Sequence, residues 1–306
     1  MEFVKPDQNS LTSGLQEAID SNQTGYLLLY PGEYHIREPL IIKKGIMFIS
    51  NNKSILINDL NDDYQPFIVI EEYTDIKYLI ANSNNKAGII IGKNNSNNTI
   101  NIEYMKIYNT GNGYNKKPMK ALEINGYNII INNLDIFLGN VGLSLENASD
   151  IRIKEVQIVN CSTGIRMFNA NNINIDNFSV DSCYYTGFQM DSTKNSYFKG
   201  IIWNNDYEYL NNNNNWSLLI GKYTGDLNDT INFNLRIVNT GKSAIDLSNV
   251  HNLYITSIIN NKNKIENGIT YGKNIKNINI NGIMNNVRNL YSGKVVGENN
   301  ILINNP

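Results

Sequence analysis

The chain has 306 residues, 41% of them hydrophobic and 18% charged, with a formal net charge of −2. The length allows a substantial core, and the near-neutral charge gives no electrostatic basis for binding nucleic acid or anionic membranes. No run approaches the roughly 20 apolar residues of a membrane span, and the first residues do not read as a secretory signal, so we expect neither segment in this chain.

The first element that the sequence predicts is a short amphipathic helix over residues 10–22, in "LTSGLQEAIDSNQTG". Its apolar residues fall on one helical face: Leu11, Leu15, Ala18 and Ile19. Ser10, Thr12 or Ser13 is available as the N-cap. We expect this helix to cap the first turn of the strand region, because an exposed strand edge invites aggregation.

From residue 26 onward, short β-type segments recur in a fixed order. "GLSLE", "GIRMF" and "GFQMD" begin at Gly142, Gly164 and Gly187, with spacings of 22 and then 23 residues. Between them lie segments such as "DIRIK", "NINID" and "VQIVNCSTG", each with period-2 alternation and bounded by Asn- or Gly-rich turns. Such units bury their inner faces only by stacking on one another. The pattern predicts an all-β, single-stranded right-handed parallel β-helix with three short strands per coil, one domain over residues 1–306 with its coils over 26–306.

Asparagine and cysteine follow the same register. The chain contains 58 Asn, a residue that forms turns well and helices poorly. Asn109, Asn160 and Asn239 occupy one repeat position, which predicts side-chain amide ladders between coils. Cys161 and Cys183 lie 22 residues apart. They are expected to stack as buried thiols, with a disulfide as the alternative.

The segments "GLQEAID", "YLLLYPGEYHI" and "PLIIKKGIMFI" follow one another at the start of the chain. This order resembles the opening of the pectate-lyase-like superfamily, which includes phage tailspike depolymerases. The resemblance implies the β-helix fold and a carbohydrate partner. Phage relatives are often trimers and secreted lyases are usually monomers, so a monomer and a homotrimer both stay open.

Candidate catalytic residues come from the outward positions of the first strand of each coil. Glu123 and Arg166 occupy one outward position, and Glu146 and Asp191 lie at strand ends. Stacking at strand spacing should bring all four to one face. The alternative for each residue is a solvated surface position or a cross-coil ion pair.

Two long insertions, Asn109–Lys120 and Asn204–Ser217, leave the same corner and should flank this face. Aromatic side chains beside polar groups suit stacking on sugar rings. For Trp203 and Trp216 a role in the core or in anchoring the loop is the alternative. The predicted substrate-binding residues are Lys120, Gln189, Trp203, Tyr207, Tyr209, Trp216 and Asp246.

Three functions fit this arrangement. The first is a polysaccharide-degrading enzyme that acts outside the cell or on a virion. As a hydrolase it would use two of Glu123, Glu146 and Asp191. As a lyase it would use Arg166 with Lys120, and Ca²⁺ on the acids is then the one cofactor to consider. The second is a glycan-binding adhesin or phage tail protein that does not cut, and the third is a purely structural β-helix. No metal-binding triad is visible, since His35 and His251 stand alone.

Overall fold

The structure is a computed structural model that describes residues 2–43, 45–71, 73–92, 99–111, 118–203, 216–241, 243–292 and 301–304. The chain divides into two compact units, Met1–Val156 and Gln157–Pro306. The single domain predicted over residues 1–306 stays a prediction.

The N-terminal unit contains a single described helix and a series of parallel strands. Its elements are β1 (Glu2–Val4), α1 (Leu15–Ser21), β2 (Tyr26–Leu29), β3 (Gly32–Ile36), β4 (Leu40–Ile42), β5 (Met47–Ile49), β6 (Ser54–Asn58), β7 (Ile68–Ile70), β8 (Asp75–Lys86), β9 (Ile89–Ile91), β10 (Ile100–Thr110), β11 (Lys120–Ile124) and β12 (Tyr127–Glu146).

Strand β13 (Ser149–Phe168) runs across the division, and the later strands belong to the C-terminal unit. They are β14 (Asn171–Asp181), β15 (Thr186–Asp191), β16 (Lys194–Trp203), β17 (Trp216–Ile220), β18 (Asn228–Val238), β19 (Ser243–Leu247), β20 (Val250–Tyr271), β21 (Ile275–Ser292) and β22 (Ile301–Asn304).

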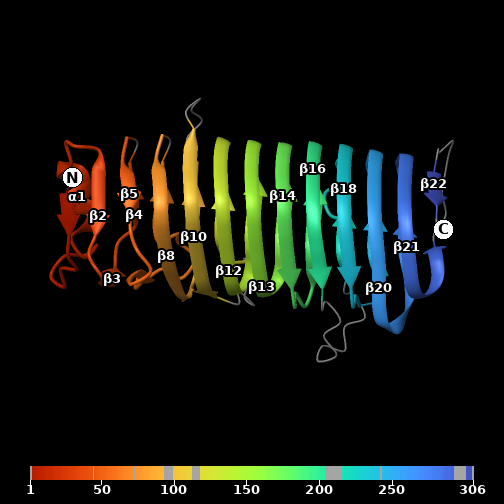
Figure 1. Ribbon diagram of the computed structural model, residues 1–306, viewed down its shortest axis with the longest axis horizontal. Coiled ribbons are helices and arrows are strands. Elements are labelled where there is room, and N and C mark those ends of the chain that lie inside the picture. Colours follow the sequence, from red (N-terminus) through yellow and green to blue (C-terminus); the bar gives the residue numbers. More distant parts are fainter. Residues whose placement is uncertain are drawn as a thin grey trace. The chain divides into compact units, whose positions relative to one another are not determined.

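Within each unit, a strand pairs in parallel with the equivalent strand of the next turn (Figure 1). In the N-terminal unit β4, β7, β9, β11 and β12 form one such ladder. In the C-terminal unit β13, β15, β17, β19 and β20 form another. The predicted parallel solenoid is therefore confirmed. Strand β13 runs unbroken through two of the predicted short strands, "DIRIK" and "GIRMF", so three strands per coil stays a prediction.

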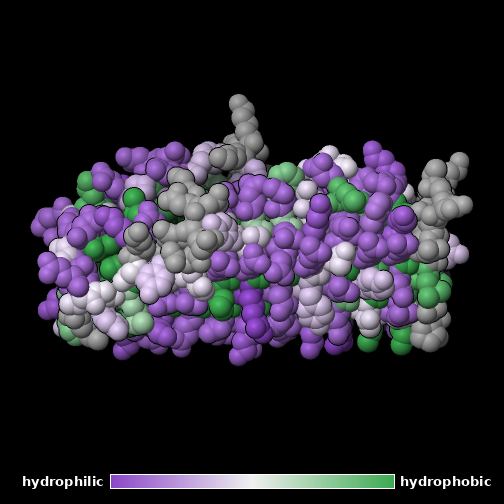
Figure 2. All heavy atoms as spheres, turned by 90° about the horizontal axis from the view of Figure 1, so that it is seen from above, coloured by the Kyte–Doolittle hydropathy of each residue, from purple (hydrophilic) through white to green (hydrophobic). Residues whose placement is uncertain are grey.

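The core is built from the inward residues of successive turns, as the alternation predicts. In the opening turn of the C-terminal unit Ile165, Met167, Ile175 and Val180 are buried. A column of aromatic rings, Phe178, Phe188, Phe198 and Phe233, has neighbouring centroids 4.9–5.5 Å apart. Such contacts add stabilisation beyond area burial. The outer face seen in Figure 2 is mostly hydrophilic, with hydrophobic residues scattered over it.

Asparagine fills the corners of the turns because it tolerates the left-handed backbone conformation. Asn109, Asn160 and Asn239 have φ values of 57°, 57° and 53°. This region is costly for most L-residues but accessible to Asn. Amide ladders are present as predicted: Asn109 Nδ2 donates to Asn82 Oδ1 at 3.3 Å, and Asn277 Nδ2 donates to Asn252 Oδ1 at 2.9 Å.

Helix α1 is shorter than predicted. Leu15, Ala18 and Ile19 are buried as expected, but Leu11 lies before the helix and is exposed. The residue at the N-cap is Gly14, which has a φ of 81°. Thr12 Oγ1 accepts a hydrogen bond from the backbone N–H of Gln16 at 3.1 Å, so one predicted cap residue still serves the first turn. The role of α1 as an end cap stays a prediction.

The two cysteines are buried free thiols, which agrees with the predicted thiol stack. Burial raises the pKa of Cys161 to about 12 and raises that of Cys183 as well. Desolvation of the thiolate is the main cause for both.

Candidate functional site

The predicted site residues fall into two groups, one in each compact unit. Lys120, Glu123 and Glu146 belong to the N-terminal unit, and the rest of those described belong to the C-terminal unit. Tyr207 and Tyr209 lie outside the described residues. A single face shared by Glu123, Glu146, Arg166 and Asp191 therefore stays a prediction.

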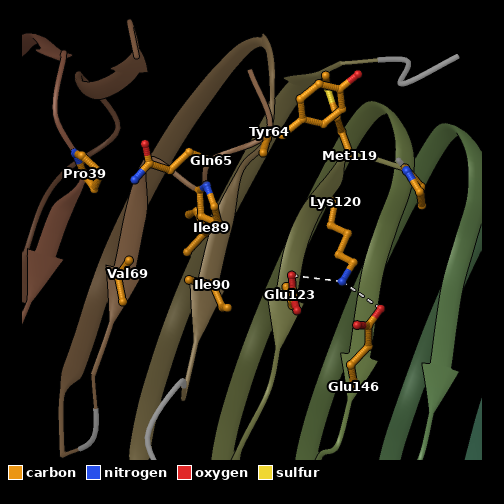
Figure 3. Close-up of a pocket in the computed structure, with 13 residues that line it drawn as sticks. Pro39, Tyr64, Gln65, Val69, Ile89, Ile90, Met119, Lys120, Glu123 and Glu146 are labelled. Carbon is orange, nitrogen blue, oxygen red and sulfur yellow. Dashed lines mark ion pairs between the residues drawn. The ribbon is translucent and has the colours of Figure 1, made fainter. Parts of the chain in front are cut away.

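In the N-terminal unit, Lys120 joins two carboxylates from neighbouring turns. Its Nζ lies 3.0 Å from Glu123 Oε2 and 2.8 Å from Glu146 Oε1, and we call these three residues the Lys120 triad (Figure 3). The side chains of the triad are only 15–20% exposed. Glu146 Oε1 also accepts a hydrogen bond from Ser144 Oγ at 3.0 Å. The triad is thus a largely buried, charge-assisted network.

A break in the strand alternation brings Lys120 and Glu123 to the same side. Two consecutive residues, Ala121 and Leu122, are fully buried, which leaves the residues on either side facing outward. Glu123 pairs in register with Ser144, and Glu146 lies two residues farther along the same strand. Because alternate strand residues share a face, Glu146 emerges beside Glu123.

The triad closes one end of a pocket of about 400 Å³ in the same unit. Val69 and Ile90 precede Glu123 in the same register column and form an apolar floor. Tyr64 and Met119 line the pocket at another edge (Figure 3). The remaining lining residues are Pro39, Gln65, Pro66, Ala87, Ile89 and Pro118. An apolar surface with a few convergent polar groups is typical of a small-ligand site.

The geometry limits how far apart the two carboxylates lie. Distances of 3.0 and 2.8 Å to one shared nitrogen place the two contacting oxygens at most 5.8 Å apart. Carboxyl groups of retaining glycosidases lie about 5–5.5 Å apart and those of inverting enzymes about 6.5–9.5 Å. With one ammonium for two carboxylates, the triad carries a formal charge of −1.

In the C-terminal unit, Asp246 and Trp216 are held by a residue that the sequence did not single out. Lys222 Nζ lies 3.0 Å from Asp246 Oδ2 and 4.1 Å from the centroid of the Trp216 ring. Asp246 and Trp216 are both buried, so this cation contacts a carboxylate and an aromatic face that are shielded from water. Trp216 also packs edge-to-face against Tyr185.

Asp191 lies beneath the short segment Gly221–Asp226, which carries Lys222. Its Oδ1 accepts a hydrogen bond from the backbone N–H of Tyr223 at 3.2 Å, and its side chain is buried. Burial raises the pKa of Asp191 above its ordinary value, although hydrogen bonds from this segment and from Gln189 and the charge of Arg166 oppose the rise. The Tyr223 hydroxyl is hydrogen-bonded to that of Tyr185, and burial raises the pKa of Tyr223.

The other predicted residues of this unit occupy two ladders. Arg166 and Gln189 are register partners, and Gln189 pairs in turn with Leu219, so they share one outward column. Trp203 pairs with Asp181 and Val238 in the ladder of β14, β16 and β18, where it is 37% exposed. Trp203 is therefore an exposed residue rather than a core residue.

Sequence reasoning missed the residues that complete both clusters. Tyr64 lies in "LNDDYQP", an irregular stretch rich in turn residues between β6 and β7. Lys222 and Tyr223 lie in "GKYTGDLND", which interrupts the coil pattern between β17 and β18. Both segments interrupt the repeat in the sequence. These interruptions could have indicated the missed residues, because binding residues are often found in irregular segments on a regular scaffold.

No group of three or more His, Cys, Asp or Glu side chains that could hold a metal ion occurs among the described residues. Within the described part of the chain, no helix is long and apolar enough to cross a membrane.

No protein-family model matches the sequence, and no curated protein matches it. Two structures of PfbA, a surface adhesin of Streptococcus pneumoniae, superpose on the chain with TM-scores of 0.59 and 0.61 at 15% identity. They cover 92% and 95% of this chain and 87% and 91% of their own. The A-module of the Azotobacter vinelandii mannuronan C-5 epimerase AlgE4 has a TM-score of 0.54 at 12% identity, and the match covers 96% of this chain and 95% of that one.

The protein has the right-handed parallel β-helix fold. The resemblance to pectate-lyase-like proteins, predicted from the first forty-nine residues, is confirmed for the fold. A β-helix offers long rows of outward side chains on a rigid core, and its function depends on the side chains that those rows carry. In this β-helix the Lys120 triad combines a network of charged side chains with a pocket of about 400 Å³.

Proposed function

We propose that this β-helix protein acts outside the cell and binds a polysaccharide, with the pocket of the Lys120 triad taking one sugar unit. The observation that carries the proposal is the combination of an apolar floor with a charged end in one pocket of about 400 Å³. A sugar ring has an aliphatic face that can pack on Val69 and Ile90 and hydroxyl groups that can bond to carboxylates and an ammonium. The similarity to a surface adhesin and to a polysaccharide-modifying epimerase supports a carbohydrate partner.

The charge of the triad favours a neutral sugar over an acidic one. Glu123 and Glu146 outnumber Lys120, so a carboxylate on the ligand would meet net repulsion. This argues against elimination from a uronic acid at this pocket. Because Ca²⁺ was considered only for elimination from an acidic sugar, binding of a neutral sugar at this pocket does not require it.

Hydrolysis of a glycosidic bond is the second candidate, and the separation of the carboxylates supports it. The contacting oxygens of Glu123 and Glu146 lie at most 5.8 Å apart, compatible with the spacing of retaining glycosidases. One carboxyl would have to donate a proton, whereas both now accept from Lys120. Catalysis would therefore require Lys120 to release one partner when the sugar binds.

The test is a glycan array followed by titration calorimetry with a neutral oligosaccharide that binds. Glu123→Gln and Glu146→Gln should each weaken binding by about tenfold or more, since each removes a charge-assisted contact worth about 1.5–3 kcal/mol. Glu103→Gln is the matched control, because Glu103 forms an exposed ion pair with Lys77 outside the pocket. Full affinity in both triad variants would show that the sugar binds elsewhere.

A reducing-end assay on the same oligosaccharide distinguishes cutting from binding. New reducing ends without an ultraviolet-absorbing unsaturated product mark hydrolysis, and the unsaturated product marks elimination. Binding without either product assigns the protein to the adhesin class.

A further inference from the structure

A second pocket, of about 350 Å³, lies in the C-terminal unit on strands β16, β18 and β20. It belongs to a different ladder from Gln189 and Asp246. Gly200, Leu235 and Ser257 are register partners and form its floor. Exposed or half-exposed residues rise on both sides of this floor: Lys199, Asn234 and Thr256 on one side, and Ile201, Arg236 and Ile258 on the other.

The charge of this groove is entirely positive. Lys199 and Arg236 lie on adjacent strands, offset by two residues across the floor, and no carboxylate is among the lining residues. Neither cation has an ion-pair partner within 4.0 Å in the described part of the unit. Two like charges on neighbouring strands repel each other weakly unless an anion lies between them.

The floor contains a polar atom with no partner in the described part of the chain, in a row of residues whose side chains face the core. Ser257 is 2% exposed, and its Oγ has no hydrogen-bond partner among the described residues. A buried hydroxyl left unpaired costs free energy, so such groups usually have a partner in the protein, in water or in a ligand. Asn177 and Asn234 add amide groups to the same lining.

We propose that this groove binds an acidic saccharide, with Lys199 and Arg236 holding its carboxylate or sulfate group. Arg236 presents a planar fork that matches an oxyanion, and Lys199 adds a second charge. Ile201 and Ile258 offer apolar surface to the ring, while Asn177 and Asn234 offer polar contacts to its hydroxyl groups. The groove is larger than a single inorganic anion requires. This site is distinct from the Lys120 triad, and its ligand has the opposite charge preference.

Calorimetry with four probes tests the proposal on the full chain: a hexuronate oligosaccharide, a sulfated oligosaccharide, a neutral oligosaccharide of equal length, and sodium sulfate. At least one acidic oligosaccharide should bind, more weakly as salt rises, and which one binds identifies the anionic group. Lys199→Ala and Arg236→Ala should each weaken that binding by tenfold or more. Lys194→Ala and Arg288→Ala are the matched controls, since both residues are exposed and lie outside the lining.

Three results would overturn the proposal. The first is that neither acidic oligosaccharide binds. The second is that the neutral oligosaccharide or sodium sulfate binds with the same affinity as the acidic one. The third is that the control variants lose as much affinity as Lys199→Ala and Arg236→Ala. Glu123→Gln should leave binding at this groove unchanged, so failure here and failure of the triad site are separate outcomes. Circular dichroism of each variant confirms that the strands are retained.

Discussion

Replacing Lys120 by Met removes the cation that joins Glu123 and Glu146 while keeping a side chain of similar length. Two charge-assisted contacts, at 3.0 and 2.8 Å, are lost together. Such contacts are worth about 1.5–3 kcal/mol each when shielded and about 0.2–1 kcal/mol when exposed. Because the three side chains are 15–20% exposed, we take the lower end of the shielded range. The free energy of unfolding should fall by about 3 kcal/mol in total.

Thermal unfolding followed by circular dichroism measures this loss. For a compact unit of this size, 1 kcal/mol corresponds to about 2–4 °C, so the midpoint should fall by roughly 6–12 °C. Lys77→Met is the matched control: Lys77 Nζ lies 3.1 Å from Glu103, but those side chains are 50% and 57% exposed. The control should lose less than about 1 kcal/mol.

Adding Glu123→Gln and Glu146→Gln to Lys120→Met should restore part of the stability. The double replacement removes two shielded carboxylates that would otherwise lack a cation. If Lys120→Met and Lys77→Met lower the midpoint equally, shielding does not strengthen the triad. If the triple variant is less stable than Lys120→Met alone, unpaired charge is not the source of the loss.

Two further predictions concern buried groups of the C-terminal unit. Burial raises the pKa of Asp191, so its ionisation costs stability as pH rises from the ordinary value of 3.8 through the raised value. Asp191→Asn, which stays neutral and can still accept from Tyr223, should therefore unfold at a higher temperature than wild type at pH 7. This advantage should vanish below about pH 3.8, and an unchanged difference across this pH range would contradict it. Cys161 and Cys183 should resist alkylation at pH 8 in the native protein and react in denaturant; rapid native labelling, measured by mass spectrometry, would show that the thiols are accessible.

Local sequence patterns were enough to predict the β-helix. Each turn repeats the same requirements: alternate apolar residues facing inward and residues that tolerate positive φ at the corners. Ile165 and Met167 satisfy the first requirement, and Asn109 and Asn239 satisfy the second. These requirements concern residues only a few positions apart, so the amino-acid sequence alone is enough to recognise them.

Part of the candidate site could also be predicted from the sequence, because the repeat fixes which residues of neighbouring turns are register partners. Glu123 and Glu146 were expected on one face of neighbouring turns, and in the structure both contact one cation. That this cation is Lys120 depends on Ala121 and Leu122, two consecutive residues that are both buried. A pattern of period two does not contain two consecutive buried residues.

Only the tertiary structure decided what covers each carboxylate. Asp191 and Asp246 are outward residues in the repeat, yet the segment that carries Lys222 and Tyr223 folds over them and shields them from water. The path of such an irregular segment depends on contacts with residues distant in the chain rather than on the coil pattern. The order of amino acids therefore determined the rows of side chains that this β-helix presents, and the folded segments between the rows determined which of those side chains meet water.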